Sequence, residues 1–468
     1  MNLKSPLLLA TVAAILSACA TGPAYQKPSE PLPAAFKENA GWKLANPQDL
    51  QARGNWWEIY GDAALNDLVA QVKLNNQNVR QFEAQYRQAR AAAQAAHAGF
   101  WPTVSAGVSD NRSGSGGSNG IVKNNFNASL DASWEPDLWG KVANTVDAGE
   151  ATSQASTASL AGALLSAQAE LVQDYLQLRV LDAEQDLFDQ TVAAYAKSLQ
   201  LTKNQYNAGI VTRADVAQAE TQWQSAQAQQ LDLGIQRAQL EHAIAILIGK
   251  APADFTLAKA PVTATLPAVP AGVPSDLLER RPDIAAAERK VAAANANIGV
   301  ARAAFFPALT LSASGGFQNS SLSQWFNAPS QIWSLGLALA ETIFDGGLRK
   351  AQSEEVQANY DNTVAAYRQT VLGGLQEVED NLATLRILEQ EAKAQTAAVT
   401  AAQDSARLAL NQYKAGTTSY LNVATAQATL LSSQRSMLQL QGRQWSASVL
   451  LIKALGGGWR VDALATKP

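Results

Sequence analysis

An internal duplication of about 200 residues constrains the fold more than any other feature of the sequence. The motif Tyr-x-Ala-Gly occurs at 206–209 and again at 413–416, and this offset of 207 residues continues downstream without a gap. The offset pairs Val216 with Val423, Ala219 with Ala426, Ser225 with Ser432, Leu231 with Leu438, and Gly249 with Gly456. Solenoid repeats are only about 20 to 50 residues long, so this period predicts a duplicated domain with pseudo-twofold symmetry.

The composition excludes several classes of protein. Charged residues make up only 16% of the chain, whereas soluble domains average about 25%. After the first 20 residues, however, no apolar run approaches the ~18 residues that a spanning helix needs, which rules out a helical membrane bundle. The 36 basic and 40 acidic residues form no basic stripe, so we expect no nucleic-acid partner.

The amino terminus has the features of a secretory signal. Lys4 precedes an apolar stretch from Leu7 to Leu16 that is too short for a transmembrane anchor. The following Leu16-Ser17-Ala18-Cys19 resembles the lipobox of bacterial lipoproteins, in which cleavage leaves an amino-terminal cysteine that carries lipids. The alternative is that Cys19 is an apolar passenger of the signal peptide. Ala20 takes the place of the Asp that would resemble an inner-membrane retention signal, which favours the outer membrane.

These boundaries divide the chain into six expected segments. They are a lipoprotein signal peptide (1-18), a lipidated tether (19-55), a first repeat (56-250), a Pro-rich linker (251-274), a second repeat (275-458) and a C-terminal tail (459-468). Acylation of Cys19 would leave no thiol for a disulfide or a nucleophile, because the chain has no other cysteine.

Each repeat predicts long helices and two strands. Residues 64–99 contain good helix formers without proline, and residues 142–206 carry an apolar stripe with a 3.5-residue period that indicates coiled-coil packing. Between them, apolar and polar residues alternate with a period of two in Thr103–Ser109 and again in Phe126–Trp134, separated by a polar loop from Asn111 to Asn125. The second repeat follows the same plan. Each Tyr-x-Ala-Gly motif then marks the tip of a helical hairpin, with glycine in the left-handed conformation.

Four strands of about nine or ten residues have the length of transmembrane barrel strands, but four strands cannot close a barrel. Because open sheet edges are not tolerated in hydrocarbon, other copies of the chain must complete it. Two copies give eight strands with a filled interior, and three give twelve strands with a lumen. Small or polar residues at the inward positions favour the lumen and hence a homotrimer: Ser105, Gly107, Ser129, Ser334 and Gly336. The alternative is the edge of a soluble sandwich.

Several motifs resemble those of a known family. They are Leu277-Leu278-Glu279-Arg280-Arg281-Pro282-Asp283-Ile284, Ile298-Gly299-Val300-Ala301-Arg302, Phe305-Phe306-Pro307 and Trp134-Glu135-Pro136-Asp137-Leu138-Trp139-Gly140-Lys141. In order and spacing over about residues 55 to 458, they are similar to outer-membrane efflux lipoproteins of the TolC/OprM type, NodT branch. The resemblance implies a mainly α fold in which three chains form a 12-stranded transmembrane β-barrel continuous with a periplasmic α-helical barrel. It also implies a periplasmic adaptor and an inner-membrane efflux pump of the RND class as partners, together with outer-membrane lipid.

The resemblance also assigns candidate residues. The adaptor-facing hairpin tips are Gly209, Ile210, Gly416 and Thr417, and the periplasmic constriction comprises Asp215, Tyr413, Leu421, Asn422 and Thr425. The family commonly has carboxylates at the constriction, but here Leu421, Asn422 and Thr425 are uncharged. We expect closure to depend on a hydrogen bond between Asp215 and Tyr413 and on packing of Leu421. The alternative is a helix-capping Asp215 and a core Tyr413.

The sequence contains no recognisable catalytic set of a nucleophile, a base and a group that orients the base. No Gly-rich phosphate-binding loop follows a predicted strand. We therefore expect no catalysis, no metal site and no cofactor other than the covalent lipid on Cys19. The predicted function is the outer-membrane exit channel of a tripartite efflux system, a class associated with antibiotic resistance. The alternative is a periplasmic adaptor or scaffold lipoprotein without a pore. The sequence does not specify whether the substrate is a drug, solvent, metal or dye.

Overall fold

The computed structural model describes residues 22–29, 31–38, 55–114, 116, 122–267 and 276–459. The signal peptide, Cys19, much of the tether and nearly all of the C-terminal tail lie outside the described residues. The described chain divides into two compact units. Unit 1 lies within Met1–Glu30, Gln85–Thr157 and Ala286–Arg368, and unit 2 lies within Pro31–Ala84, Ala158–Ala285 and Gln369–Pro468.

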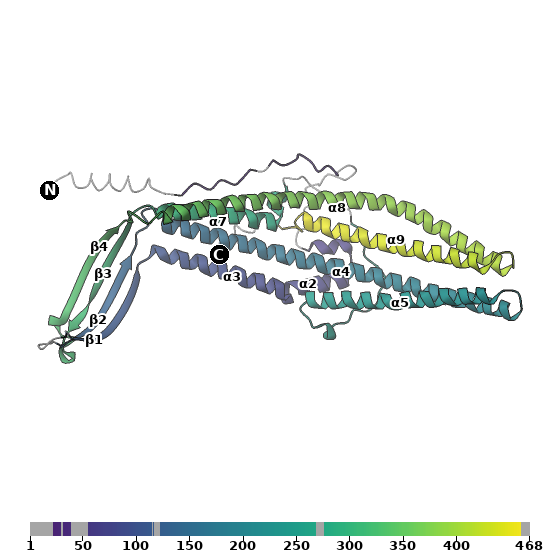
Figure 1. Ribbon diagram of the computed structural model, residues 1–468, viewed down its shortest axis with the longest axis horizontal. Helices are drawn as coiled ribbons and strands as arrows, with labels where there is room; N and C mark the ends of the chain where they lie inside the picture. The colour runs from purple at the N-terminus through teal and green to yellow at the C-terminus, as the bar shows by residue number, and fades with distance from the viewer. Residues whose placement is uncertain are drawn as a thin grey trace. The chain divides into compact units, whose positions relative to one another are not determined.

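Unit 1 contains one antiparallel sheet of four strands in the order β1-β2-β3-β4 (Figure 1). The strands are β1 (Thr103–Gly114), β2 (Val122–Trp134), β3 (Ala308–Asn319) and β4 (Gln331–Ala340). The alternation of apolar and polar residues correctly predicted all four. The expected loop from Asn111 to Asn125 was too long, because Asn111 pairs with Asn125 and the ladder continues to Gly114 and Val122. Backbone hydrogen bonds continue a ladder whatever the side chains are, so its polar end was missed.

Helices account for most of the remaining chain. They are α2 (Ala63–Asn75), α3 (Gln77–His97), α4 (Lys141–Asn207), α5 (Arg213–Leu247), α6 (Leu277–Arg280), α7 (Pro282–Ala303), α8 (Leu348–Lys414) and α9 (Tyr420–Ala454). Short 3-10 helices lie at Trp56–Tyr60, Ala98–Phe100, Pro252–Asp254, Leu322–Gln324 and Ala328–Ser330. Helices α4 and α8 have 67 residues each, and α5 and α9 have 35 each. The second repeat therefore reproduces the lengths of the two longest helices of the first.

The helix expected over residues 64–99 is interrupted at Asn76. This residue has an extended backbone, with ψ at 123°, and separates α2 from α3. Its side-chain oxygen accepts a hydrogen bond from the backbone N–H of Val79 at 3.1 Å, and its amide donates to the carbonyl of Leu247 at 2.8 Å. The asparagine therefore begins α3 and also contacts the end of α5, a tertiary contact that the helix period does not reveal.

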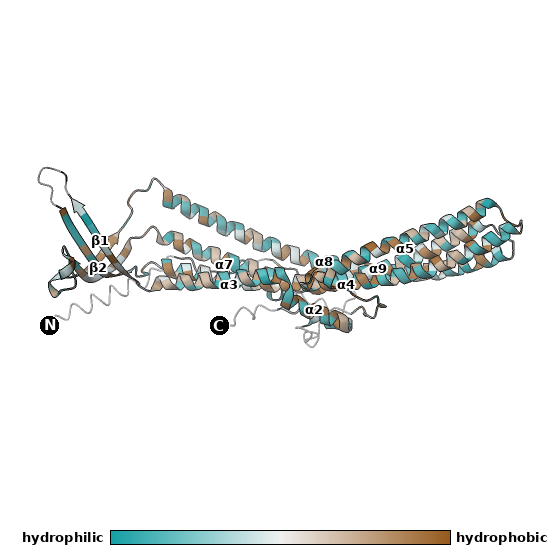
Figure 2. Cartoon of the chain, turned by 90° about the horizontal axis from the view of Figure 1, so that it is seen from below, coloured by the Kyte–Doolittle hydropathy of each residue, from teal (hydrophilic) through white to brown (hydrophobic). Residues whose placement is uncertain are grey.

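Hydrophobic and hydrophilic residues are mixed along the long helices (Figure 2). Within the described chain, no helix combines the length and the hydropathy that crossing a membrane requires.

The linker after α5 packs against unit 2 through two buried carboxylates. Asp182 on α4 accepts a hydrogen bond from the backbone N–H of Ala260 at 3.2 Å. Asp62, just before α2, accepts one from the hydroxyl of Thr263 at 3.0 Å. Both carboxylates are buried, so each must be satisfied by such donors. The linker is thus a bonded part of unit 2 over these residues.

Candidate functional site

The sheet of unit 1 has one apolar and one polar face. Directly paired residues of an antiparallel sheet lie on the same face, and the register places apolar residues opposite one another: Leu309 with Leu339, Leu311 with Leu337, and Ala106 with Leu130. The other face carries small and polar residues, including all five expected inward positions: Ser105, Gly107, Ser129, Ser334 and Gly336. The sequence therefore correctly predicted which residues share a face.

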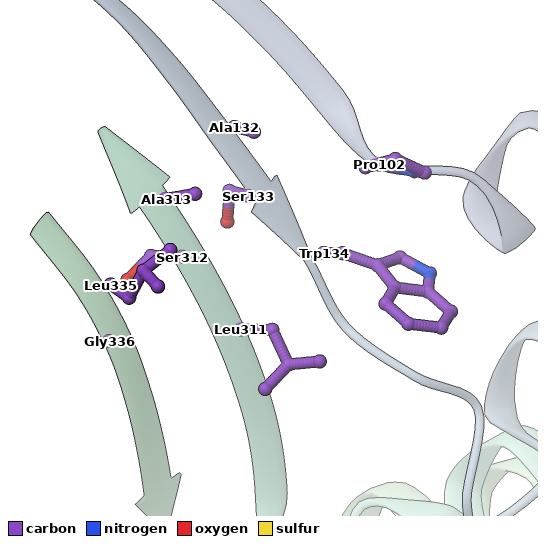
Figure 3. A pocket seen from close by; sticks show the side chains of 9 residues that line it. All are labelled: Pro102, Ala132, Ser133, Trp134, Leu311, Ser312, Ala313, Leu335 and Gly336. Carbon is purple, nitrogen blue, oxygen red and sulfur yellow. The ribbon is translucent and has the colours of Figure 1, made fainter. Parts of the chain in front are cut away.

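The apolar face is exposed in the single chain. Trp333 and Leu335 retain 77% and 76% of their accessible surface. A shallow hollow of about 320 Å³ lies on this face, where Trp134, Leu311 and Leu335 surround it (Figure 3). A contiguous apolar face that is exposed in the single chain marks an interaction with a membrane or another protein.

Aromatic side chains gather at both ends of the sheet. At the end near the β3–β4 connection, Phe126 and Phe317 of the apolar face contact Trp325 and Phe326, with ring centroids 5.6 Å apart in each pair. At the opposite end, the indole of Trp134 donates a hydrogen bond to the carbonyl of Phe100 at 3.1 Å. An apolar band flanked by aromatic residues is typical of strands that cross a membrane.

The outer strands of the sheet have unpaired edges among the described residues. β1 pairs only with β2, and β4 pairs only with β3. Such edges present unpaired N–H and C=O groups that can pair with another chain. The sheet is therefore suited to extension on both sides.

In unit 2, the two hairpin tips have the same backbone geometry. Gly209 and Gly416 both have φ of 76°, the left-handed conformation that favours glycine. The N–H of Gly209 donates to Tyr206 O at 2.9 Å, and that of Gly416 donates to Tyr413 O at 3.0 Å. The predicted role of glycine at the helix ends is thus confirmed in both repeats.

An exposed residue follows the glycine at each tip. Ile210 is exposed on the α4–α5 tip, and its N–H donates to Gln205 O at 2.9 Å. Thr417 on the α8–α9 tip is held in the same way, since its N–H donates to Gln412 O at 3.0 Å.

A buried aromatic pair links the two hairpins. Tyr413 at the end of α8 and Tyr420 at the start of α9 pack edge to face, with their ring centroids 5.5 Å apart. The Tyr420 hydroxyl donates to the side-chain oxygen of Gln222 on α5 at 3.3 Å. They pack in a cluster with Leu199, Val216, Ala219, Val423 and Ala424. Burial raises the pKa of Tyr420 to about 12 and also raises that of Tyr413, so both hydroxyls stay protonated and donate hydrogen bonds at neutral pH.

The expected hydrogen bond between Asp215 and Tyr413 is not the one that forms. The Tyr413 hydroxyl donates to Thr202 Oγ1 at 3.1 Å. Asp215 instead lies in the first turn of α5, where its Oδ2 accepts from the backbone N–H of Thr212 at 2.9 Å in a capping box. The carboxylate satisfies the backbone N–H of Thr212, and the Thr212 hydroxyl in turn accepts from the backbone N–H of Asp215. The charge of Asp215 acts on Tyr413 at longer range, where it contributes to the raised pKa of the tyrosine.

The uncharged residues predicted to form the constriction lie on the first turns of α9. Leu421 is 56% exposed. Asn422 donates to the hydroxyl of Thr418 at 2.6 Å, and the hydroxyl of Thr425 donates to Leu421 O at 2.9 Å. Leu421 and Thr425 share one side of the helix, since they are four residues apart.

Sequence reasoning missed two residues of this site, Thr202 and Tyr420. Comparison of the repeats gave no signal for Tyr420, because Arg213 occupies its equivalent position in the first repeat. Thr202 is fully buried on α4, where its hydroxyl also donates to Ser198 O at 2.9 Å. Over the described ranges, no group of three or more His, Cys, Asp and Glu could hold a metal ion.

A sheet with an exposed apolar face and open edges, carried with long helical hairpins, defines the class of outer-membrane channel subunits. The chain belongs to the outer membrane efflux protein family, whose model matches residues 68–250 and 273–457. The motif resemblance is thereby confirmed, as are an outer-membrane location and the function of an efflux channel.

Relatives and solved structures agree with this assignment. The chain is 32% identical over 472 residues to the antibiotic efflux pump outer membrane protein ArpC of Pseudomonas putida, covering 97% of this chain and 96% of the relative. The same values hold for the toluene efflux pump outer membrane protein TtgC of Pseudomonas putida. The solved outer-membrane channel OprN is similar with a TM-score of 0.88 and 29% identity, covering 94% of this chain and all of that one. The family is one of channel proteins.

Proposed function

We propose that three copies of the chain close their sheets into one twelve-stranded barrel and form the exit channel of a tripartite efflux system. The observation that carries this proposal is the four-stranded sheet with one exposed apolar face and two unpaired edges. Open edges are not tolerated in hydrocarbon, and eight strands would leave no lumen. A pore-free adaptor or scaffold would have no use for such a sheet.

The partners follow from the absence of an energy source in the described chain. We propose that a periplasmic adaptor contacts the hairpin tips at Gly209, Ile210, Gly416 and Thr417, and that an inner-membrane pump, of the RND class, drives transport. Ile210 is an exposed apolar side chain on a rigid turn, which suits protein contact. Relatives named for antibiotic and toluene efflux support small apolar molecules as substrates.

Extraction from membranes tests the assembly. The purified chain should migrate on gels as a trimer-sized species that converts to monomer on heating. A monomer before heating would contradict the proposal. A trimer that also conducts ions would exclude the alternative of an adaptor without a pore.

We propose that Leu421, Asn422 and Thr425 form an uncharged periplasmic constriction, closed by the aromatic cluster of Tyr413 and Tyr420. Asn422→Asp should then place three carboxylates in the constriction and make the channel more permeable to cations and sensitive to multivalent cations, because a ring of acidic side chains attracts them. The reversal potential in a salt gradient measures this effect. Thr429→Asp, about two turns further along the exposed side of α9, is the control. Equal shifts in both variants would contradict the assignment.

We further propose that Cys19 carries the lipid that anchors the chain in the outer membrane. The expected result is a mature amino-terminal peptide that begins at Cys19 and carries acyl chains, seen by mass spectrometry of the purified protein. In Cys19→Ser the acylated peptide should be absent. An uncleaved or unacylated wild-type terminus would refute the lipid anchor.

A further inference from the structure

The polar face of the sheet carries very little charge. Among the described strand residues of this face, Asp131 is the single carboxylate and Lys123 the single base. Both lie on β2, eight residues apart, which corresponds to about 26 Å along a strand. Lys123 pairs with Ser113 at the end of the sheet next to the β1–β2 connection. The two charges are therefore too far apart to neutralise each other.

Hydroxyl groups surround Asp131. Its Oδ2 accepts a hydrogen bond from Ser129 Oγ at 2.8 Å, and Ser105 and Ser314 are its direct neighbours on β1 and β3. Asp131, Ser105 and Ser314 line a hollow of about 360 Å³, together with Thr103, Ser133 and Ser334. Asp131 is thus a hydrogen-bonded and exposed carboxylate in a concave polar surface.

We propose that Asp131 determines the cation preference of the channel. This inference rests on the proposed trimer, in which the threefold symmetry brings three copies of Asp131 to one level of the lumen. The constriction residues Leu421, Asn422 and Thr425 carry no charge, so the barrel supplies a fixed negative charge that they lack. A ring of carboxylates raises the local concentration of cations and lowers that of anions.

The expected size of the effect follows from Coulomb attraction in water. Three charges about 10 Å from an ion on the axis, screened at about 0.1 M salt, raise the cation concentration there about twofold and lower the anion concentration about twofold. The ratio of cation to anion permeability therefore changes roughly four- to fivefold. The ligand class is a hydrated cation that passes through, not one held in a coordination site.

The test compares two variants that each remove one carboxylate from neighbouring strands. Asp131→Asn should lower the ratio of K⁺ to Cl⁻ permeability by roughly four- to fivefold, measured as the reversal potential in a KCl gradient across a planar bilayer. Asp110→Asn is the matched control, because Asp110 pairs with Phe126 on the apolar face and should leave the ratio unchanged. Asp131→Glu should retain the preference of the wild type. A wild-type ratio in Asp131→Asn, or equal shifts in both Asn variants, would overturn the inference.

A second measurement does not depend on the neutral variant. Since Cys19 is the single native cysteine, Asp131→Cys can be labelled in the open channel with methanethiosulfonate reagents. A sulfonate reagent should restore the cation preference, and an ammonium reagent should shift it toward anions. If neither reagent changes the reversal potential, Asp131 does not face the lumen and the inference fails. If the wild type forms no conducting trimer, the proposed function itself fails.

Discussion

Tyr413→Ala is expected to loosen the tip end of the helical hairpins, where we propose the constriction, and to raise the single-channel conductance. Tyr413 is 2% exposed, and it joins α8 to α4 through its hydrogen bond to Thr202 and to α9 through its contact with Tyr420. Truncation of a buried aromatic side chain costs about 3–5 kcal/mol through lost packing and the cavity left behind. Planar-bilayer recordings would show larger unitary steps, and thermal unfolding would show a lower Tm.

The duplication supplies a matched control. Tyr206 occupies the position of Tyr413 in the first repeat but is 41% exposed. Tyr206→Ala should therefore cost less than about 1 kcal/mol and leave conductance unchanged. Similar effects of the two variants would contradict the asymmetry between the hairpins. Tyr413→Phe retains the ring and should have a smaller effect, which separates the packing from the hydrogen bond to Thr202.

Asp182→Ala is expected to destabilise unit 2 by about 3–5 kcal/mol, because a buried cation loses its partner. Asp182 is 1% exposed and accepts hydrogen bonds from Arg179 Nη1 and Arg237 Nε, each at 2.8 Å. Arg179 is buried as well and also donates to the carbonyl of Ala258 in the linker at 2.8 Å. Limited proteolysis should cut the linker faster, and the Tm of the purified protein should fall.

A neighbouring ion pair of the same linker provides the control. Lys259 contacts Asp186 at 2.6 Å, but the two side chains are 39% and 58% exposed. Exposed pairs contribute about 0–1 kcal/mol, so Lys259→Ala should leave proteolysis of the linker and the Tm nearly unchanged. If Asp182→Ala and Lys259→Ala have equal Tm values and equal rates of linker cleavage, the buried carboxylate of Asp182 does not stabilise the linker.

The helices and strands could be predicted from local patterns, because their periods follow from backbone geometry. The stripe over residues 142–206 and the alternation around Leu130 and Leu337 correctly indicated the element type and the shared faces. The ends of the strands were harder to predict, because a backbone ladder extends through polar residues such as Asn111 and Asn125. The break at Asn76 depends on a contact with Leu247, which lies far away in the sequence.

The partners within the candidate site could not be predicted. Family resemblance led to Asp215 and Tyr413 as a hydrogen-bonded pair, whereas each bonds elsewhere. Asp215 follows Thr212 by three residues, a spacing that itself indicates a capping box and could have predicted its role. The hydrogen bond from Tyr413 to Thr202 depends on how α4 is rotated about its axis relative to α8 within unit 2. The hydrophobic period of a single helix does not specify this rotation.

Single-channel recording of the detergent-purified protein in planar bilayers tests the central claim most directly. Three sheets that close through their β1 and β4 edges should give discrete unitary steps with the trimer-sized fraction and none with the fraction dissociated by heat. Absence of steps from an intact trimer, or equal conductance from the dissociated chains, would contradict a channel that only three copies complete.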